Sequence, residues 1–246
     1  MALVGAAALA GGAVNAIAGG GSLITFPTLL ACGIPAVTAS ATNTVALCPG
    51  YLGAALAQRR DMVGQGRRAA RVLPGAAIGG VAGALVLMHV SPKAFDVVVP
   101  FLLLVAVVLL GVQDRLRAYL AKGREHGQSE LAAAVLVALA SVYGGFFGAG
   151  LGIIVLGVLG VVIEDTFTRL NAFKQFTTLI VNVAAAIVFV LVARLDWSVV
   201  IAMAVMSLIG GVIGGAIASR VSAKVLRAIV MIIGSAVSAV YFVKLF

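Results

Sequence analysis

The chain reads GGGS at residues 19–22, directly before the apolar run Leu23–Leu30, and GAGLG at residues 148–152, at the matching place in its second half. Apolar segments broken by glycine in this way predict helices that begin inside a membrane. Irregular backbone survives at membrane depth only where it lines a cavity, so a pair of such breaks is the best indication in the sequence of a transport site.

The composition is that of a polytopic membrane protein. Of 246 residues, 63% are hydrophobic and 10% are charged, whereas soluble domains have roughly 45–50% apolar and about 25% charged residues. Most of the chain lies in apolar runs that approach the roughly 20 residues needed to cross a hydrocarbon core of about 30 Å. The first charged residue is Arg59. Because residues 1–18 lack the basic start of a signal peptide, we expect them to form the first span and not to be cleaved.

The charge pattern also fits a membrane protein. The net charge of +9 comes from Lys and Arg residues in short stretches between apolar runs. The positive-inside rule produces this pattern, so it argues against nucleic-acid binding. The two cysteines, Cys32 and Cys48, lie in apolar runs without metal-ligand or redox spacing. We therefore expect neither a disulfide nor a metal site.

The apolar runs predict an all-α fold with two repeats of five helices, each about four long transmembrane helices and one short re-entrant helix. The first membrane repeat, residues 1–112, has predicted helices at 2–18, 22–32, 36–57, 69–88 and 94–112. A cytoplasmic linker follows at 113–130. The second membrane repeat, residues 131–246, has predicted helices at 131–147, 151–162, 167–193, 197–218 and 223–245.

Local matches between the halves indicate a duplication. The pattern Arg-x-Asp at residues 59–61 recurs at 194–196, and the pattern Gly-x-x-x-Gly-Gly at 75–80 recurs at 210–215. The glycines of the second pattern have near-helical spacing, which lets membrane helices approach closely, so we expect them to serve packing.

The distribution of Lys and Arg predicts how the two halves are oriented. With an odd number of crossings in each half, the halves are inverted, and the basic residues other than Lys174 divide 13 to 3 between the two sides. Parallel halves divide them 11 to 5. The positive-inside rule favours the inverted arrangement. Both termini then lie outside a cell (inner or plasma) membrane, the linker is cytoplasmic, and each short helix forms a hairpin with the span before it.

The glycine breaks are the first candidate anion site. A helix that begins inside the membrane presents unpaired N–H groups and the positive end of its dipole, the arrangement that binds anions. In the first half this places Gly20, Gly21 and Ser22 at the site, and in the second half Gly150 and Gly152. The alternative is a packing turn, in which Ser22 caps the helix instead of donating to a ligand.

Polar side chains within apolar helices complete the predicted site. They are Thr42, Asn43 and Thr44 in the first half and Lys174 and Gln175 in the second. Polar groups at this depth need partners or water, so we expect them to face the interior. Asn15, in the first span, either lines the pore or bonds its own helix.

The charged residues narrow the chemistry further. Lys174 is the one basic residue placed clearly within a span, and its charge suits an anionic ligand. Alternatively, the long Lys174 side chain extends towards the membrane surface. All eight carboxylates fall at predicted helix ends or in loops, which leaves no acid for cation binding. No HExxH pattern or serine-paired histidine is present, so we expect no enzyme.

Two stretches resemble a known family. GGGSLITFPTLLACGIPAVTASATNTVA at residues 19–46, with a looser second copy GGFFGAGLGIIVLGVLG at 144–160, is similar to the TauE/SafE membrane permeases, often grouped as sulfite exporters. The resemblance covers essentially the whole chain. It implies transport of small sulfur-containing anions, such as sulfite, sulfonates and sulfoacetate, without a bound cofactor. The family glycines and proline map onto Gly20, Gly21 and Pro27. The second half departs from the pattern, with Gly157 in place of a proline and a charged run at 169–175.

These observations predict a secondary transporter that exports a small sulfur-containing anion such as sulfite or an organosulfonate, by alternating access at a site between the repeats. An inside-negative potential of about 100 mV favours expulsion of an anion by roughly 2.3 kcal/mol per charge. An anion channel and a non-transporting structural or assembly subunit of the membrane are the alternatives. The expected partners are the lipid bilayer and the anion, with a second copy of the chain as a further candidate and no nucleic acid.

Overall fold

The structure, a computed structural model, describes residues 1–17, 20–121, 129–217 and 223–245. Gly19 of the first glycine break and residues 122–128 of the predicted linker lie outside the described residues. The described residues form helices and connections without a strand. The helices are α1 (Ala2–Ile17), α2 (Ser22–Ala31), α3 (Ala36–Ala57), the 3₁₀ turn η1 (Arg59–Met62), α4 (Gly66–His89), α5 (Pro92–Ala121), α6 (Glu130–Phe146), α7 (Leu151–Val162), α8 (Phe167–Val192), α9 (Trp197–Ile217) and α10 (Ala223–Leu245).

These helices confirm the predicted all-α fold, and most ends agree with the prediction to within three residues. The main difference is α5, which continues to Ala121 instead of ending at 112. The added segment is helical because its side chains are mostly good helix formers and because Asp114 is bound by Arg227 of α10 at 2.6 Å. Part of the predicted linker is therefore a helical extension of the membrane helix.

Five helices are long and apolar enough to cross a membrane: Gly66–His89, Pro92–Leu116, Phe167–Val192, Trp197–Gly214 and Val225–Val243. Their outer faces are apolar; on α5, for example, Phe101 and Val108 are at least half exposed. An apolar surface of this extent suits lipid and not water. By contrast, α1 and α6 have 16 and 17 residues, which at 1.5 Å per residue fall short of a bilayer core.

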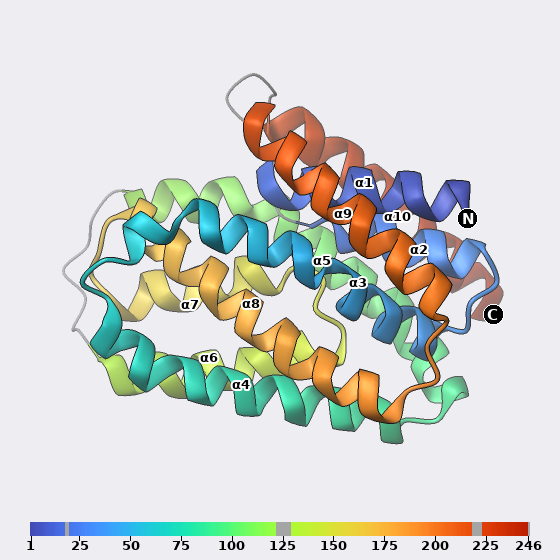
Figure 1. Cartoon of the computed structure of the whole chain (residues 1–246), viewed down its shortest axis with the longest axis horizontal. Helices are drawn as coiled ribbons and strands as arrows, with labels where there is room; N and C mark the ends of the chain where they lie inside the picture. Colours follow the sequence, from blue (N-terminus) through green and yellow to red (C-terminus); the bar gives the residue numbers. More distant parts are fainter. Residues whose placement is uncertain (18–19, 122–128, 218–222, 246) are drawn as a thin grey trace.

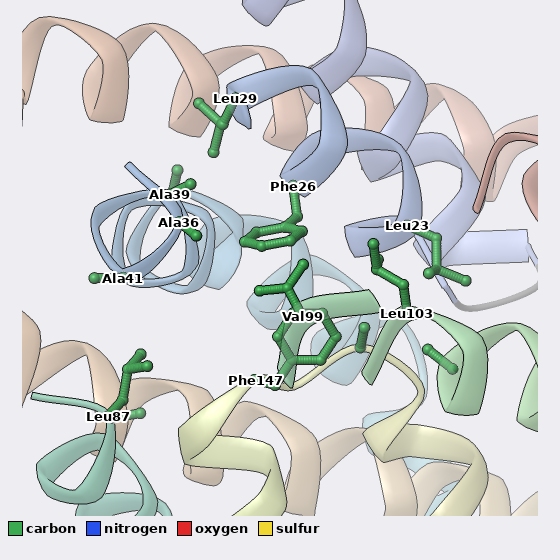
Figure 2. Packing of buried hydrophobic residues seen from close by; sticks show 14 of the residues in the cluster. Leu23, Phe26, Leu29, Ala36, Ala39, Ala41, Leu87, Val99, Leu103 and Phe147 are labelled. Atoms are coloured by element: carbon green, nitrogen blue, oxygen red, sulfur yellow. The ribbon is translucent and has the colours of Figure 1, made fainter. Parts of the chain in front are cut away.

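The two shorter helices are each continued by a helix that turns back. In Figure 1, α1 runs inward from the end of the molecule that holds both termini, and α2 returns to that end. The pair α6 and α7 enters and returns at the opposite end, where α5 finishes. The helix pairs α1–α2 and α6–α7 are called the hairpins below. Their tips meet in the middle, where the rings of Phe26 and Phe147 lie 5.1 Å apart, edge to face (Figure 2).

The packing of long helices is exchanged between the halves. α4 packs on α6, and the corresponding helix of the second half, α9, packs on α1; likewise α3 packs on α9 and α8 on α4. Glycines at these contacts leave no room for a side chain. A Cβ atom on Gly83 would overlap the carbonyl oxygen of Val142, and one on Gly210 would overlap that of Leu9. The expected packing role is confirmed for Gly79, Gly80, Gly210 and Gly214, where an added Cβ would lie less than 3 Å from a main-chain atom of a neighbouring helix.

A network of charged side chains ties the halves at the end opposite the termini. Asp165, in the connection between α7 and α8, accepts hydrogen bonds from Arg68 of α4 at 2.8 Å and from Arg169 at 2.9 Å. Arg169 also donates to the carbonyl oxygen of Val63 at 2.9 Å. Burial by itself raises the pKa of Asp165, but the hydrogen bonds from Arg68 and the Thr166 amide, with the charge of Arg169, outweigh it and lower this pKa below its usual range.

Replacing Gly83 by alanine should destabilise the α4–α6 contact. The added methyl group has no free space, and overpacking of this kind costs about 1–3 kcal/mol. Gly53→Ala is the matched control, because a Cβ there has nothing within 4 Å; it should leave stability unchanged or slightly higher. The measurement is the midpoint of thermal unfolding in mild detergent. Equal midpoints for the two variants would contradict the packing role.

Replacing Asp165 by asparagine should lower the free energy of unfolding at neutral pH. It should also make this free energy change less as the pH falls. Because the folded protein lowers the pKa of Asp165, its contribution is present above the ordinary aspartate value of about 3.9 and is lost as the pH falls through the lowered value. We expect a loss of roughly 1–3 kcal/mol at pH 7 and a smaller further loss on acidification than in wild type. Asp61→Asn is the control, since the Asp61 carboxylate forms no ion pair within the part of the chain that the structure describes. Parallel pH curves for wild type and Asp165→Asn would refute this reading.

Candidate functional site

A small polar pocket lies between the tips of the two hairpins. It holds about 40 Å³ of space for solvent, room for a few water molecules or one small oxyanion, since a water needs roughly 10–15 Å³ measured in this way. Helices α1, α2, α3, α5, α7 and α8 all contribute to its wall. The lining residues are Asn15, Gly20, Ser22, Tyr51, Gln113, Gly148, Gly150, Leu151, Gly152, Ile153, Leu156, Lys174, Gln175 and Thr178.

The turn between α1 and α2 is held by an asparagine. The Oδ1 atom of Asn15 accepts a hydrogen bond from the Gly21 N–H at 2.7 Å. Gly20 has φ +89°, a conformation that favours glycine. Gly21 lies so close to α1 that a Cβ would overlap the carbonyl oxygen of Gly11. Gly21 holds the cap position of α2, and Ser22 is the first residue of the helix and lines the pocket.

The turn between α6 and α7 presents the start of a second helix to the same pocket. Gly150 precedes α7 with φ +81°. The Tyr143 hydroxyl donates to the carbonyl oxygen of Ala149 at 2.6 Å and fixes the turn. Among the described residues the Gly152 N–H has no main-chain acceptor. The positive ends of α2 and α7 therefore point at one small volume, as anion sites at helix N-termini require.

Lys174 of α8 adds a full positive charge to the pocket. Its Cδ, Cε and Nζ atoms lie 3.4, 3.8 and 3.9 Å from the position that a Cβ of Gly152 would take. The side chain thus passes along the first turn of α7 and lines the pocket. Within the described residues Lys174 forms no ion pair, and no Asp or Glu lines the pocket. A lysine without an acidic partner at the start of a helix leaves the pocket strongly positive.

The structure brings together seven of the residues predicted from the sequence: Asn15, Gly20, Ser22, Gly150, Gly152, Lys174 and Gln175. Four others lie elsewhere. Gly21 is bound to Asn15 through its amide. Asn43 accepts a hydrogen bond from Thr25 and so links α3 to α2. Thr44 donates to the Ser40 carbonyl oxygen of its own helix at 3.0 Å, and Thr42 is buried outside the pocket lining.

Three polar residues of the pocket lie outside the predicted site: Tyr51, Gln113 and Thr178. Tyr51 of α3 lies beside the side chains of Ser22 and Asn15. It is seven residues, or about two helical turns, after Thr44, so helical spacing was a usable signal. Gln113 of α5 was assigned to the linker because of its polarity. Its signal was weaker, since only the continuation of α5 beyond residue 112 brings it into the membrane region.

Two larger hollows are apolar. One, of about 300 Å³, lies between α3 and α9 and includes Gly53, Leu208 and Val212 in its wall; the other, of about 310 Å³, lies between α3 and α8 and includes Cys48 and Val190. Exposed apolar side chains in these walls suit lipid contact. Among the described residues no three His, Cys, Asp or Glu side chains gather to hold a metal ion.

Comparisons with known proteins agree that the chain is similar to membrane transporters. Residues 3–241 match the family described as "Sulfite exporter TauE/SafE". The chain is 26% identical to a "Probable membrane transporter protein" of Haemophilus influenzae, over 92% of this chain and 88% of that protein. It is 24% identical to "Probable membrane transporter protein YfcA" of Escherichia coli K12, over 94% and 86% of the two chains. A third relative, "Probable membrane transporter protein ORF9" of Sinorhizobium sp, is 28% identical, over 94% and 88%. No solved structure gives a significant match.

The family match covers nearly the whole chain, and the described helices include several that can cross a membrane. The relatives are named as membrane transporters and not as enzymes. This multi-pass membrane protein therefore belongs to the TauE/SafE sulfite exporter family of membrane transporters.

Proposed function

We propose that this transporter exports a small sulfur-containing anion, such as sulfite or an organosulfonate, through the pocket between the hairpin tips. One observation carries the proposal: the N-termini of α2 and α7 and the unpaired Lys174 converge on a pocket of about 40 Å³ whose described wall contains no carboxylate. A cation does not fit the charge of the pocket, and a large organic molecule does not fit its volume. A tetrahedral or pyramidal oxyanion fits both.

We further propose that the two halves are inverted repeats. The hairpins enter from opposite ends of the molecule (Figure 1), and the contacts of α4 and α9 are exchanged between the halves. Both features support a two-fold relation whose axis lies in the membrane plane. In such transporters one repeat rocks against the other around a site at their interface, which opens alternately to the two sides. The pocket has walls from both halves, as this motion requires.

The charges support an orientation with both termini outside. Arg59, Arg67 and Arg169 lie at the end of the molecule opposite the termini, where α3 ends and where α4 and α8 begin (Figure 1). At the other end, Lys93 lies in the first turn of α5 and Arg194 lies in the connection between α8 and α9. The more basic end faces the cytoplasm in most membrane proteins. An inside-negative potential of about 100 mV then favours outward movement of the anion by roughly 2.3 kcal/mol per charge.

Efflux of labelled sulfite from proteoliposomes tests the proposal. Replacing Lys174 by methionine keeps most of the length of the side chain but removes its charge. This variant should lower efflux roughly ten- to hundredfold, because a hydrogen bond to a charged group contributes about 1.5–3 kcal/mol. Lys93→Met, on the exposed first turn of α5, is the control and should behave as wild type.

Three outcomes would count against the proposal. Wild-type efflux no faster than that of empty vesicles would favour a structural subunit. Unchanged efflux in Lys174→Met, with unchanged thermal stability, would remove the pocket as the site. Ion currents far above the turnover of a carrier would identify a channel.

A further inference from the structure

Two amide atoms of the pocket are buried without a hydrogen-bond partner: Nδ2 of Asn15 and Oε1 of Gln113. Both residues line the pocket. Buried polar groups in folded proteins are nearly always paired with protein, water or ligand. One atom is a donor and the other an acceptor, so the two together describe what a bound molecule must offer.

The orientation of the Asn15 amide is fixed by its surroundings. Its Oδ1 atom is occupied by the Gly21 N–H at 2.7 Å, so Nδ2 is the end that stays unpaired. Nδ2 is a donor and matches an anionic oxygen, as do the N–H groups at the start of α7 and the ammonium group of Lys174. These groups form the anion-binding part of the pocket.

Gln113 presents to the pocket a buried acceptor that has no partner. No described N–H or O–H group reaches its Oε1 atom. A fully ionised oxyanion offers only lone pairs and would leave this oxygen unpaired, at a cost of roughly tenfold in affinity. A ligand with an O–H or N–H group satisfies Gln113 and the donors at the same time.

Building on the proposed function, we infer that the transported species is a monoanion that carries its own hydrogen-bond donor, and that Gln113 selects it. Hydrogensulfite, with one proton, and hydroxylated sulfonates belong to this class. Doubly charged sulfite and sulfate do not. The ligand's hydrogen lies on Gln113 Oε1, while its anionic oxygens face Asn15, α7 and Lys174. One negative charge, and not two, then crosses the membrane in each cycle.

Two isosteric probes test the inference by calorimetric titration at pH 6 of the full-length protein in detergent. Methylphosphonate is then a monoanion with an O–H group, whereas methanesulfonate has the same shape and charge but no donor. Wild type should bind methylphosphonate roughly tenfold more tightly. Gln113→Leu should reduce this preference to less than about twofold, because it removes the unpaired oxygen that disfavours methanesulfonate, and the variant should still bind methanesulfonate. Methanesulfonate therefore serves as an internal control for folding.

The outcomes separate this inference from the proposed function. Equal binding of the two probes by wild type, or the same preference in wild type and Gln113→Leu, overturns the role of Gln113 and leaves anion transport intact. Tighter binding of methanesulfonate shows that the Gln113 amide nitrogen faces the ligand and also overturns it, as does failure of methylphosphonate to bind a protein that binds sulfite. If neither probe nor sulfite binds, the proposed function itself fails.

Discussion

A helix that starts inside a membrane leaves its first N–H groups without carbonyl partners, and lipid cannot replace those partners. This constraint governs the centre of the molecule. At α2 the Asn15 side chain satisfies the Gly21 amide. At α7 the Gly152 amide has no main-chain acceptor among the described residues. The nearby Lys174 offers no acceptor and adds positive charge to the same place. The site is thus stable without a ligand only at some cost, which an anion can remove.

The close helix contacts of the two halves place this site. Gly83 against Val142 and Gly210 against Leu9 allow backbone to touch backbone, which brings α4 onto α6 and α9 onto α1. Each hairpin is therefore clamped by a long helix of the other half. The hairpin tips meet through Phe26 and Phe147, and α5 covers them, with Val99 beside the two rings in Figure 2. The apolar contact excludes lipid and leaves the polar pocket next to it.

Much of this arrangement could be predicted from the sequence, because glycine and proline set local structure strongly. The break at residues 148–152 predicts the start of α7 correctly, since Gly150 adopts a positive φ, and Pro35 precedes the first residue of α3. Lys174 and Asn15 were found because polar groups are rare in apolar runs. Asn43 has the same signal but pairs with Thr25, a contact between helices that spacing alone does not reveal. To predict Gln113 as a pocket residue, one would have to know that Asp114 is bound by Arg227 and that α5 continues past residue 112.

The hydrogen bonds and ion pairs that join the two halves differ between the two ends of the molecule. At the basic end Asp165 joins Arg68 of the first half to Arg169 of the second, and Asn171 donates to Gln58 across the same boundary at 2.6 Å. At the end that holds the termini, Asp196 accepts hydrogen bonds from Ser198 and Val199 in the first turn of α9, the helix that follows it. Separation of the halves at the basic end must break charged hydrogen bonds, whereas the described contacts near Asp196 involve no such loss. Because the pocket has walls from both halves, the proposed opening towards the basic end would have to break the hydrogen bonds around Asp165.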